Sequence, residues 1–301
     1  MDGVVNHEGL TQASAARALA SACGQVGLPC EHVDLLRLGE NAIYAIPSEG
    51  VVVRVARADT DDIEQKVAKE LAVSRWLASH DFPAVRPHDE LPQPVQAEGR
   101  LVTFWEYVPL SQAEPALVDL AGLLRDLHGL PRPDIALPVL DPFPLMRRRL
   151  AHAQGIAQQD MEFLTEACDR SEAAFRSIMA EDAGGLIHGD AHRGNLLARD
   201  GQVLLIDYEA VAIGPRAWDL IPTAIAVDRF GLSPTDYTTF CRTYDGDVTD
   251  WHGYEPLRTV RELGMTTWLM QNAHSGPAAA EFALRMDSLR KEDRERRWHA
   301  L

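Results

Sequence analysis

Three side chains between Leu186 and Glu209 have the types and spacing needed for metal-assisted phosphoryl transfer. Asp190 and Asn195 lie five residues apart in one polar loop, and Asp207 follows a short apolar run. Phosphoryl transfer requires a carboxylate that faces the acceptor hydroxyl, and hard oxygen ligands that hold Mg²⁺ against the nucleotide phosphates. We therefore predict that Asp190 is the catalytic carboxylate and that Asn195 and Asp207 bind the metal.

A hairpin is predicted to bring these three side chains together. Residues 196–198 and 203–206 are apolar, and Gly201 stands in the connection between them. This pattern is typical of two short strands joined by a tight turn. Because Gly-Asp alone is common in turns, the ordered set of residues carries the prediction, and no single residue does.

The loop opens with His188-Gly189-Asp190 and continues with His192. This pattern resembles the aminoglycoside phosphotransferase and choline kinase family, which comprises small-molecule kinases with the protein-kinase-like fold. The resemblance implies an α+β, two-lobed protein-kinase-like fold. A small β-rich N-lobe, residues 1–108, would bind the nucleotide, and a larger helical C-lobe, residues 109–301, would carry the catalytic loop and the acceptor site. It also implies ATP and Mg²⁺ as cofactors, with GTP not excluded.

The elements expected along the chain agree with this fold, since strands dominate the first part and helices the second. The expected strands are residues 35–38, 42–46, 51–56 and 101–108. The expected helices are residues 11–26, 60–79 with Thr60 as a cap and Asp61 in the first turn, 115–128, 216–230, 234–244, about 253–272 and 277–290. The tail Arg290–Arg297 is predicted to be a solvated helix end.

The nucleotide half requires a cation on a central strand and a glutamate on the next helix. In the strand VVVRVA, alternation puts Arg54 on the face opposite Val53, where it would bind phosphates. The resemblance usually places a lysine here, but the chain has only three lysines and none lies on a strand. Glu70 is the predicted partner, with Glu64 as a competitor. The alternatives are an Arg54 that reaches solvent and a Glu70 that pairs with Lys66 on an exposed helix face.

Two further segments are predicted to contact the nucleotide. The loop containing Gly39 and Asn41 would cover the phosphates, although one glycine makes this a weak signal. Backbone groups near Glu106 and Val108 would pair with the base. The sequence of this second segment is equally typical of an ordinary buried strand.

Acceptor selectivity is expected to come mainly from the helical second part. The candidates are Glu209, Arg193, Glu255, Glu262 and Trp268, because acids and aromatics together suit an aminated or hydroxylated ring. A helical core stripe with a solvated face explains the last three equally well. Asp219 resembles the aspartate that holds the catalytic loop from the following helix in this fold.

Composition limits the classes of partner. The 301 residues carry a net charge of −16, which argues against nucleic acid and permits a cationic small substrate. The four cysteines show no metal-binding spacing, and no run is long enough for a membrane span. We expect a cytoplasmic monomer or homodimer that contacts neither membranes nor nucleic acid.

The predicted function is ATP-dependent transfer of phosphate to a hydroxyl of a small molecule, in the manner of antibiotic kinases with aminoglycoside-like acceptors. One alternative is a metabolic kinase for choline, a sugar or homoserine. Another is a catalytically silent pseudokinase that binds nucleotide. Joint presence of Asp190, Asn195 and Asp207 argues against the silent form.

Overall fold

The computed structural model describes residues 10–57, 62–109, 111, 113–181, 184–273 and 276–300, without the side chain of Asn272. The chain divides into two compact units. The first comprises Met1–Pro115, Pro133–Ala136 and Gly194–Ala210, and the second comprises Ala116–Arg132, Leu137–Arg193 and Val211–Leu301. The boundary expected after Val108 stays a prediction.

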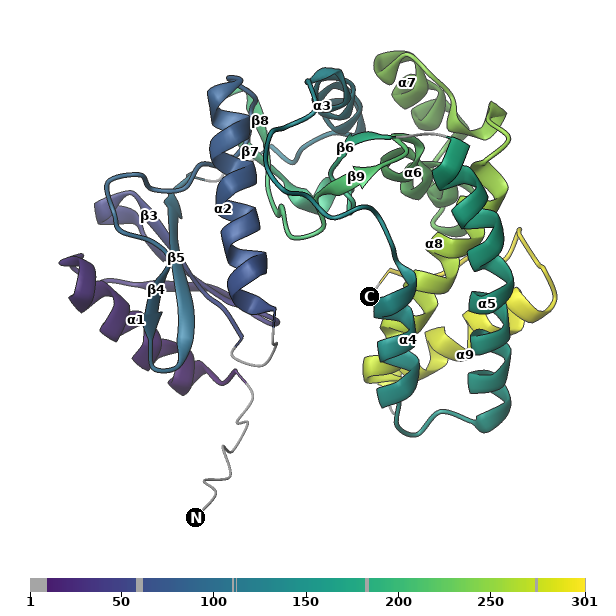
Figure 1. Ribbon diagram of the computed structural model, residues 1–301, viewed down its shortest axis with the longest axis horizontal. Helices are drawn as coiled ribbons and strands as arrows, with labels where there is room; N and C mark the ends of the chain where they lie inside the picture. Colours follow the sequence, from purple (N-terminus) through teal and green to yellow (C-terminus); the bar gives the residue numbers. More distant parts are fainter. Residues whose placement is uncertain are drawn as a thin grey trace. The chain divides into compact units, whose positions relative to one another are not determined.

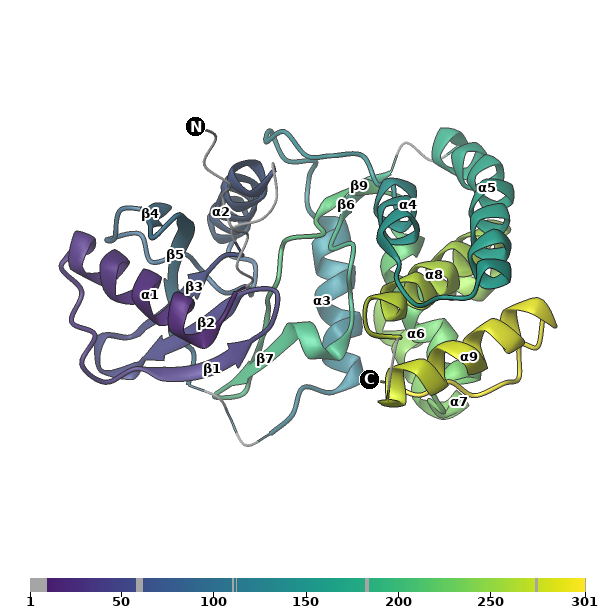
Figure 2. The ribbon, with the colours of Figure 1, turned by 90° about the horizontal axis from the view of Figure 1, so that it is seen from below.

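The first unit is built on a five-stranded antiparallel sheet with strand order β1-β2-β3-β5-β4. The strands are β1 (Asp34–Leu38), β2 (Ala42–Ile46), β3 (Val51–Val55), β4 (Val95–Ala97) and β5 (Arg100–Glu106), as Figures 1 and 2 show. Strand β5 ends two residues before the expected Val108. In β3, Val51, Val53 and Val55 are buried, while Val52 and Arg54 are partly exposed. This alternation is the one the sequence predicts, and it fixes the face on which Arg54 lies.

One helix covers each face of this sheet. Helix α1 (Gln12–Val26) is capped by Thr11, whose hydroxyl accepts a hydrogen bond from the Ser14 N–H at 3.1 Å. The apolar face of α1 belongs to the same core as Val51, Val53 and Val55. Helix α2 (Ile63–Ser79) lies on the Arg54 side and begins after Asp62. The expected cap Thr60 and the acidic Asp61 lie outside the described residues.

The expected hairpin belongs to the first unit. It consists of β7 (Leu196–Arg199) and β8 (Gln202–Leu205), with Asp200 and Gly201 at the turn. Both turn residues have positive φ, 43° and 81°, as a two-residue turn of this kind requires. Leu205 also pairs with the Ala84 segment, which anchors the strand immediately before Asp207.

The second unit is mostly helical. Its elements are α3 (Leu117–Gly129), α4 (Phe143–His152), α5 (Gln158–Glu181), β6 (Gly185–Ile187), β9 (Ala212–Gly214), α6 (Ala217–Arg229), α7 (Pro234–Tyr244), α8 (Tyr254–Leu269) and α9 (Gly276–Arg290). Helix α8 packs against α4, α5, α6 and α9, and α3 packs against α7. The short strands β6 and β9 pair with each other, and in the sequence they flank the catalytic segment.

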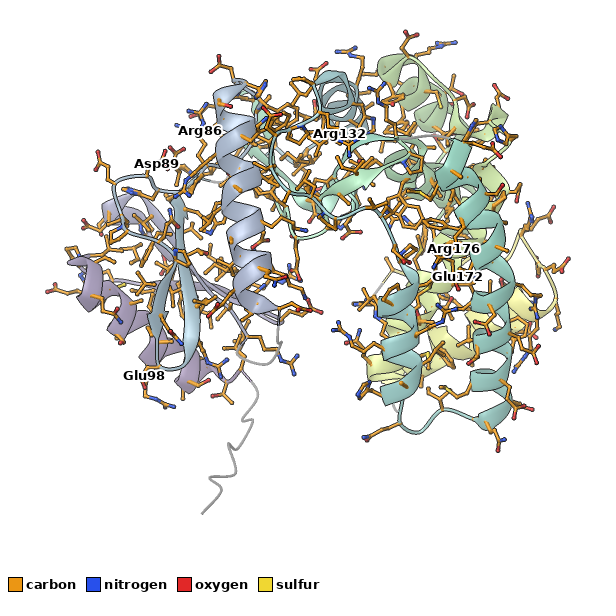
Figure 3. All side chains as sticks on the ribbon, viewed as in Figure 1. Arg86, Asp89, Glu98, Arg132, Glu172 and Arg176 are labelled. Carbon is orange, nitrogen blue, oxygen red and sulfur yellow. The ribbon has the colours of Figure 1, made fainter. Side chains whose placement is uncertain are left out.

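Surface ion pairs join α4 to α5. Arg147 donates to Glu172 at 2.5 Å, and Glu172 also accepts from Arg176 one turn later (Figure 3). Arg147 and Arg176 are exposed and Glu172 is partly buried, so these ion pairs contribute little to stability beyond fixing the two helices locally. Among the described helices, none combines the length and apolarity of a membrane span.

Candidate active site

Arg54 and Glu70 form the central ion pair of the first unit. Arg54 Nη1 donates to both carboxylate oxygens of Glu70, at 2.7 and 2.9 Å. Glu70 is only 3% exposed, whereas the competitor Glu64 is exposed. The structure therefore places the strand cation and the helix glutamate together. Both alternatives are therefore excluded for these residues. Arg54 is not directed to solvent, and Glu70 is not an exposed partner of Lys66.

The loop before β2 is tied to the same guanidinium. With its carboxamide oxygen facing Arg54, Asn41 accepts hydrogen bonds from Arg54 Nε at 3.1 Å and from Nη2 at 2.7 Å. Gly39 is exposed and donates its N–H to the Asn41 carbonyl at 3.0 Å, so the loop folds over itself. Glu70 and Asn41 together hold Arg54 in one orientation.

Three carboxylates gather beside this ion pair. An oxygen from each of Glu70, Asp207 and Glu209 lies within 4.8 Å of the others. Carboxylate oxygens at this spacing are the hard ligands that Mg²⁺ takes, so the residues present fit a magnesium ion. Asp207 has a left-handed backbone conformation with φ of 65°, which is uncommon for a residue other than glycine and concentrates at functional sites.

The charges around this cluster are only partly balanced. Burial raises the pKa of Glu70, and the neighbouring Glu209 and Asp207 carboxylates raise it further against the opposing effect of Arg54. Glu209 lies 3.5 Å from Arg54 Nη2 and 3.8 Å from Lys66 Nζ, and its backbone carbonyl accepts from Lys69 Nζ. A divalent cation would relieve the remaining repulsion among the carboxylates.

Asn195 is held next to the strand that precedes Asp207. It is buried, and its backbone carbonyl accepts the Ile206 N–H at 3.0 Å. The two predicted metal ligands therefore come from adjacent backbone segments, as the hairpin implied. Arg193 is exposed in the short helical turn Arg193–Asn195.

Asp190 belongs to the second unit, where a histidine and an arginine face it. Its Oδ2 lies 3.6 Å from His192 Nε2, and its Oδ1 lies 3.9 Å from Arg261 Nη1. Desolvation alone would raise the pKa of Asp190, but the interactions with His192 and Arg261 outweigh it and hold the pKa below its ordinary value. The carboxylate is therefore ionised at neutral pH.

Asp219 holds the backbone of the catalytic loop. Its carboxylate accepts the His188 N–H at 2.6 Å and the Gly189 N–H at 2.8 Å, and it faces His128 Nε2 at 3.1 Å. Gly189, which has φ of 85°, accepts a hydrogen bond from the Trp218 indole at 3.0 Å. Asp219 is fully buried, so the scaffold role expected from the sequence is confirmed.

The segment predicted to contact the base follows β5. The Glu106 N–H donates to Arg86 and the Tyr107 N–H donates to Gly50. Within the described part of the chain, the Val108 N–H has no hydrogen-bond acceptor. Glu106 itself is exposed and Val108 is buried.

The acceptor candidates on α8 fall into different environments. Glu262 is buried and bonded to Arg229 at 2.8 Å and to Arg258 at 3.2 Å. Glu255 is exposed and paired with Arg294, while Trp268 is 42% exposed. The placement of Glu262 favours the alternative reading of this helix as a core stripe.

The sequence did not single out Arg261, although it lies within the segment considered for the acceptor. Its guanidinium carbon lies 4.4 Å from the centre of the Trp218 ring. The available signal was an arginine between Val260 and Glu262, one helical turn after Arg258. Only packing against α6 reveals that it faces Asp190.

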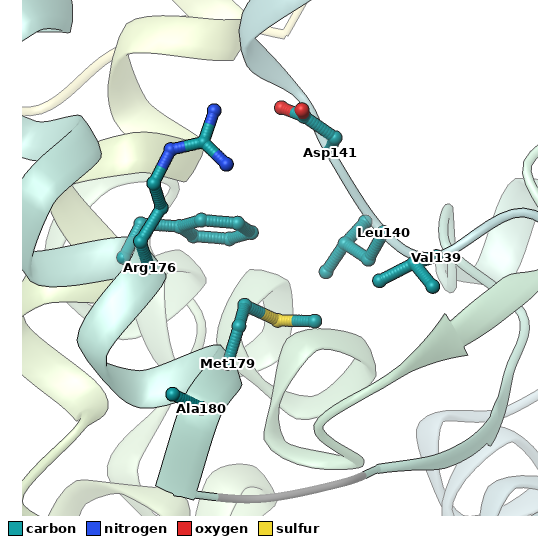
Figure 4. A pocket seen from close by; sticks show the side chains of 7 residues that line it. Val139, Leu140, Asp141, Arg176, Met179 and Ala180 are labelled. Carbon is teal, nitrogen blue, oxygen red and sulfur yellow. The ribbon is translucent and has the colours of Figure 1, made fainter.

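Two cavities lined by described residues of the second unit contain no predicted site residue. The larger, about 420 Å³, lies between α5 and the loop before α4, where Arg176 and Asp141 face the opening from opposite sides (Figure 4). The smaller, about 250 Å³, is lined by Arg125, His128, Gly129, Arg216, Tyr244 and Asp245. It borders His128, which contacts Asp219.

Solved kinase structures have the same fold. An amicoumacin kinase in complex with AMP-PNP, Ca²⁺ and amicoumacin is 14% identical, with a TM-score of 0.68 over 89% of this chain and 90% of that one. A choline/ethanolamine kinase family protein from Mesorhizobium loti is 15% identical, with a TM-score of 0.61 over 93% of both chains. An aminoglycoside-3′-phosphotransferase of type VIII is 21% identical, with a TM-score of 0.61 over 83% and 99%. The expected α+β, protein-kinase-like fold is confirmed.

Sequence comparison identifies the family. Comparison with curated proteins gives no significant match. The profile described as "Phosphotransferase enzyme family", in contrast, matches residues 40–257, which include Arg54, Glu70, Asp190, Asn195 and Asp207. Since the match covers more than half of the chain, this protein belongs to the phosphotransferase enzyme family.

Proposed function

We propose that this protein transfers the γ-phosphoryl group of ATP to a hydroxyl group of a small molecule. The observation that carries the proposal is the cluster of Glu70, Asp207 and Glu209 oxygens within 4.8 Å, beside the Arg54–Glu70 ion pair. Family membership supports the reaction class, and the cluster supports the use of a metal–nucleotide complex.

Arg54 binds the nucleotide phosphates in this scheme. Glu70 and Asn41 orient its guanidinium, so that little conformational entropy is lost when phosphate binds. Arginine donates through a planar fork and remains charged, which suits phosphate oxygens, although its reach differs from that of lysine. Gly39 brings backbone close to the phosphates.

Asn195 and Asp207 would hold Mg²⁺, with Glu209 close by. The bound ion would neutralise charge on the β- and γ-phosphates. Of the backbone groups that follow β5, the Glu106 carbonyl would accept from the base and the Val108 N–H would donate to it. An acceptor and a donor separated by one residue match the N6 amino group and N1 of adenine, which supports ATP over GTP.

Asp190 positions the acceptor hydroxyl for attack on the γ-phosphorus. The new bond joins the acceptor oxygen to phosphorus, and the bond from phosphorus to the β–γ bridging oxygen breaks, which releases ADP. The hydroxyl proton passes to Asp190 late in the reaction and then to solvent. A carboxylate that is ionised at neutral pH is in the correct form to accept it.

The acceptor is proposed to be a hydroxylated antibiotic, with a metabolite such as choline, a sugar or homoserine as the second candidate. Related structures include amicoumacin, aminoglycoside and choline kinases, so the fold alone favours neither class. A silent pseudokinase is disfavoured because the catalytic carboxylate and both predicted metal ligands are present in one chain. Cytoplasmic location and oligomeric state stay predictions.

Nucleotide consumption tests the proposal directly. The protein would be incubated with Mg²⁺ and either ATP or GTP, together with aminoglycosides, peptide and nucleoside antibiotics, sugars and choline. At least one hydroxylated acceptor should stimulate ADP formation. Asp190→Ala should abolish this stimulation while leaving the melting temperature nearly unchanged, and Asp236→Ala, an exposed carboxylate on α7, should behave as wild type.

Calorimetry tests the metal site separately. Asp207→Ala should remove the Mg²⁺ dependence of ATP binding, because one of the hard ligands is lost. Near-normal turnover by a folded Asp190→Ala protein, or unchanged Mg²⁺ dependence in Asp207→Ala, would contradict the respective assignment.

A further inference from the structure

Arg261 lies beside the catalytic carboxylate with much of its hydrogen-bonding capacity unused. Its Nη1 lies 3.9 Å from Asp190 Oδ1, and its guanidinium stacks on Trp218 at 4.4 Å. The side chain is 15% exposed and its Nε and Nη2 atoms are buried, so a ligand reaches these two atoms only when the neighbouring side chains move. Arg261 lies just outside residues 40–257, and family membership therefore assigns it no role.

The unused donors of Arg261 form one edge of its guanidinium. Nε and Nη2 are buried and have no hydrogen-bond partner among the described residues. Leaving such donors unsatisfied is unfavourable, and most buried polar groups in proteins are paired. The Nε–H and Nη2–H bonds are parallel, so this edge matches the two oxygens of a carboxylate.

The two acids predicted on α8 to bind an acceptor are already neutralised. Glu262 is bonded to Arg229 and Arg258, and Glu255 pairs with Arg294. On α8, the charged side chain that faces Asp190 is therefore a cation. An amine in this position would be repelled by Arg261, whereas an anion would be attracted.

We propose that Arg261 determines acceptor specificity by binding a carboxylate close to the hydroxyl that Asp190 positions. The acceptor is then a hydroxy acid, or a larger hydroxylated molecule with an acidic group, and not a polycationic aminoglycoside. This inference rests on the proposed function, and it narrows the acceptor class predicted from the sequence. Because Arg261 and Asp190 are in contact, the hydroxyl and the carboxylate must be separated by a short carbon chain.

The test uses three molecules with one carbon skeleton and different charge. D-gluconate is an anion, sorbitol is neutral and glucamine is a cation, and kanamycin serves as a polycationic antibiotic. Binding to the full-length protein with Mg²⁺ and AMP-PNP would be measured by calorimetry. Gluconate should bind at least about tenfold more tightly than glucamine, a difference of ~1.4 kcal/mol. Arg261→Gln should reduce the ratio to near one, and Arg261→Lys should retain part of it.

Matched controls separate this inference from the proposed function. Arg170→Gln removes the same charge from an exposed position on α5 and should keep the preference for gluconate. Asp190→Asn should abolish phosphoryl transfer while the preference for the anion persists. Turnover therefore tests the proposed function, and the binding preference tests the role of Arg261. Circular dichroism would verify that each variant is folded.

Three results would overturn the proposal. The first is tighter binding of glucamine or kanamycin than of gluconate by the wild-type protein. The second is an unchanged charge preference in folded Arg261→Gln, and the third is no binding of gluconate while AMP-PNP binds. The last result would support the nucleotide site and refute only the proposed role of Arg261.

Discussion

The guanidinium of Arg54 makes contacts that a lysine could not reproduce. It donates to Glu70 through Nη1 and to Asn41 through Nε and Nη2, so one side chain joins a strand, a helix and a loop. A lysine ammonium has the charge but lacks the planar arrangement of donors. The three residues should therefore act as a unit.

A double-mutant cycle tests this unit. Arg54→Ala and Glu70→Ala should each lower kcat/KM for ATP by tenfold or more, about 1.4 kcal/mol. The double variant should be little worse than the worse single variant, since contacting residues are coupled. Arg54→Lys should keep partial activity. Small, additive effects would refute the placement of the nucleotide phosphates at Arg54.

The pH dependence of the reaction should report the interactions of Asp190 with Arg261 and His192. The pKa of Asp190 lies below its ordinary value, so the ionised form persists and kcat/KM falls only as the pH drops through this lowered pKa. Arg261→Gln removes a positive charge and should raise the pKa, which moves the acid limb of the profile to higher pH.

The variant His192→Gln tests the second neighbour of Asp190. Because His192 also lowers the pKa of Asp190, its removal should move the limb in the same direction. His188 contributes as well and remains in both variants. An acid limb that stays in place in both variants would show that another group controls the profile.

At the scale of the element, the catalytic loop depends on helix α6. Asp219, in the first turn of α6, accepts two backbone N–H groups of the loop and contacts His128 of α3. Burial would raise the pKa of Asp219, but the interactions with His128 and with the His188 backbone hold it below its ordinary value. Its contribution to stability is therefore present above the unfolded pKa and is lost as the pH falls through the lower folded pKa.

Asp219→Asn should destabilise the second unit and reduce turnover together. The amide can accept through one oxygen only, so at least one buried N–H loses its acceptor, at a cost of about 1–3 kcal/mol. Urea denaturation and kcat would be measured on the same sample. Asp126→Asn, an exposed residue on α3, is the control. Full stability in Asp219→Asn would mean that the loop is held by other contacts.

At the scale of the whole molecule, Trp298 near the C-terminus joins the core of the second unit. The tail Arg290–Arg297 is largely exposed, as expected, but the expected helix is wrong, because α9 ends at Arg290 and the Asp293 and Arg296 carbonyls accept from Arg229 of α6. The Trp298 N–H donates to the Arg229 carbonyl at 2.6 Å, and its ring lies 4.4 Å from the Arg229 guanidinium carbon. Trp298 is 3% exposed.

Removal of the Trp298 side chain should destabilise the protein strongly. Trp298→Ala should lower the free energy of unfolding by about 3–5 kcal/mol, since a large buried aromatic leaves a cavity beside a buried arginine. Lys291→Ala, which removes an exposed side chain from the same tail, should change it by less than ~1 kcal/mol. Equal midpoints in urea for both variants would show that the tail does not contribute to the core.

The sequence by itself determined the features that depend on local geometry. The spacing of Asp190, Asn195 and Asp207 indicated the chemistry, and Asp200-Gly201 fixed the hairpin because few residues adopt positive φ. Strand alternation gave the face of Arg54, since the period of a strand is independent of its surroundings. Tertiary structure decided which groups meet across the fold. Glu70 and not Glu64 reaches Arg54, Glu262 is neutralised in the core, and Arg261 stands beside Asp190. A helical pattern identifies an apolar stripe, but only long-range packing determines which charged side chains at its margins are buried, paired or exposed to a ligand.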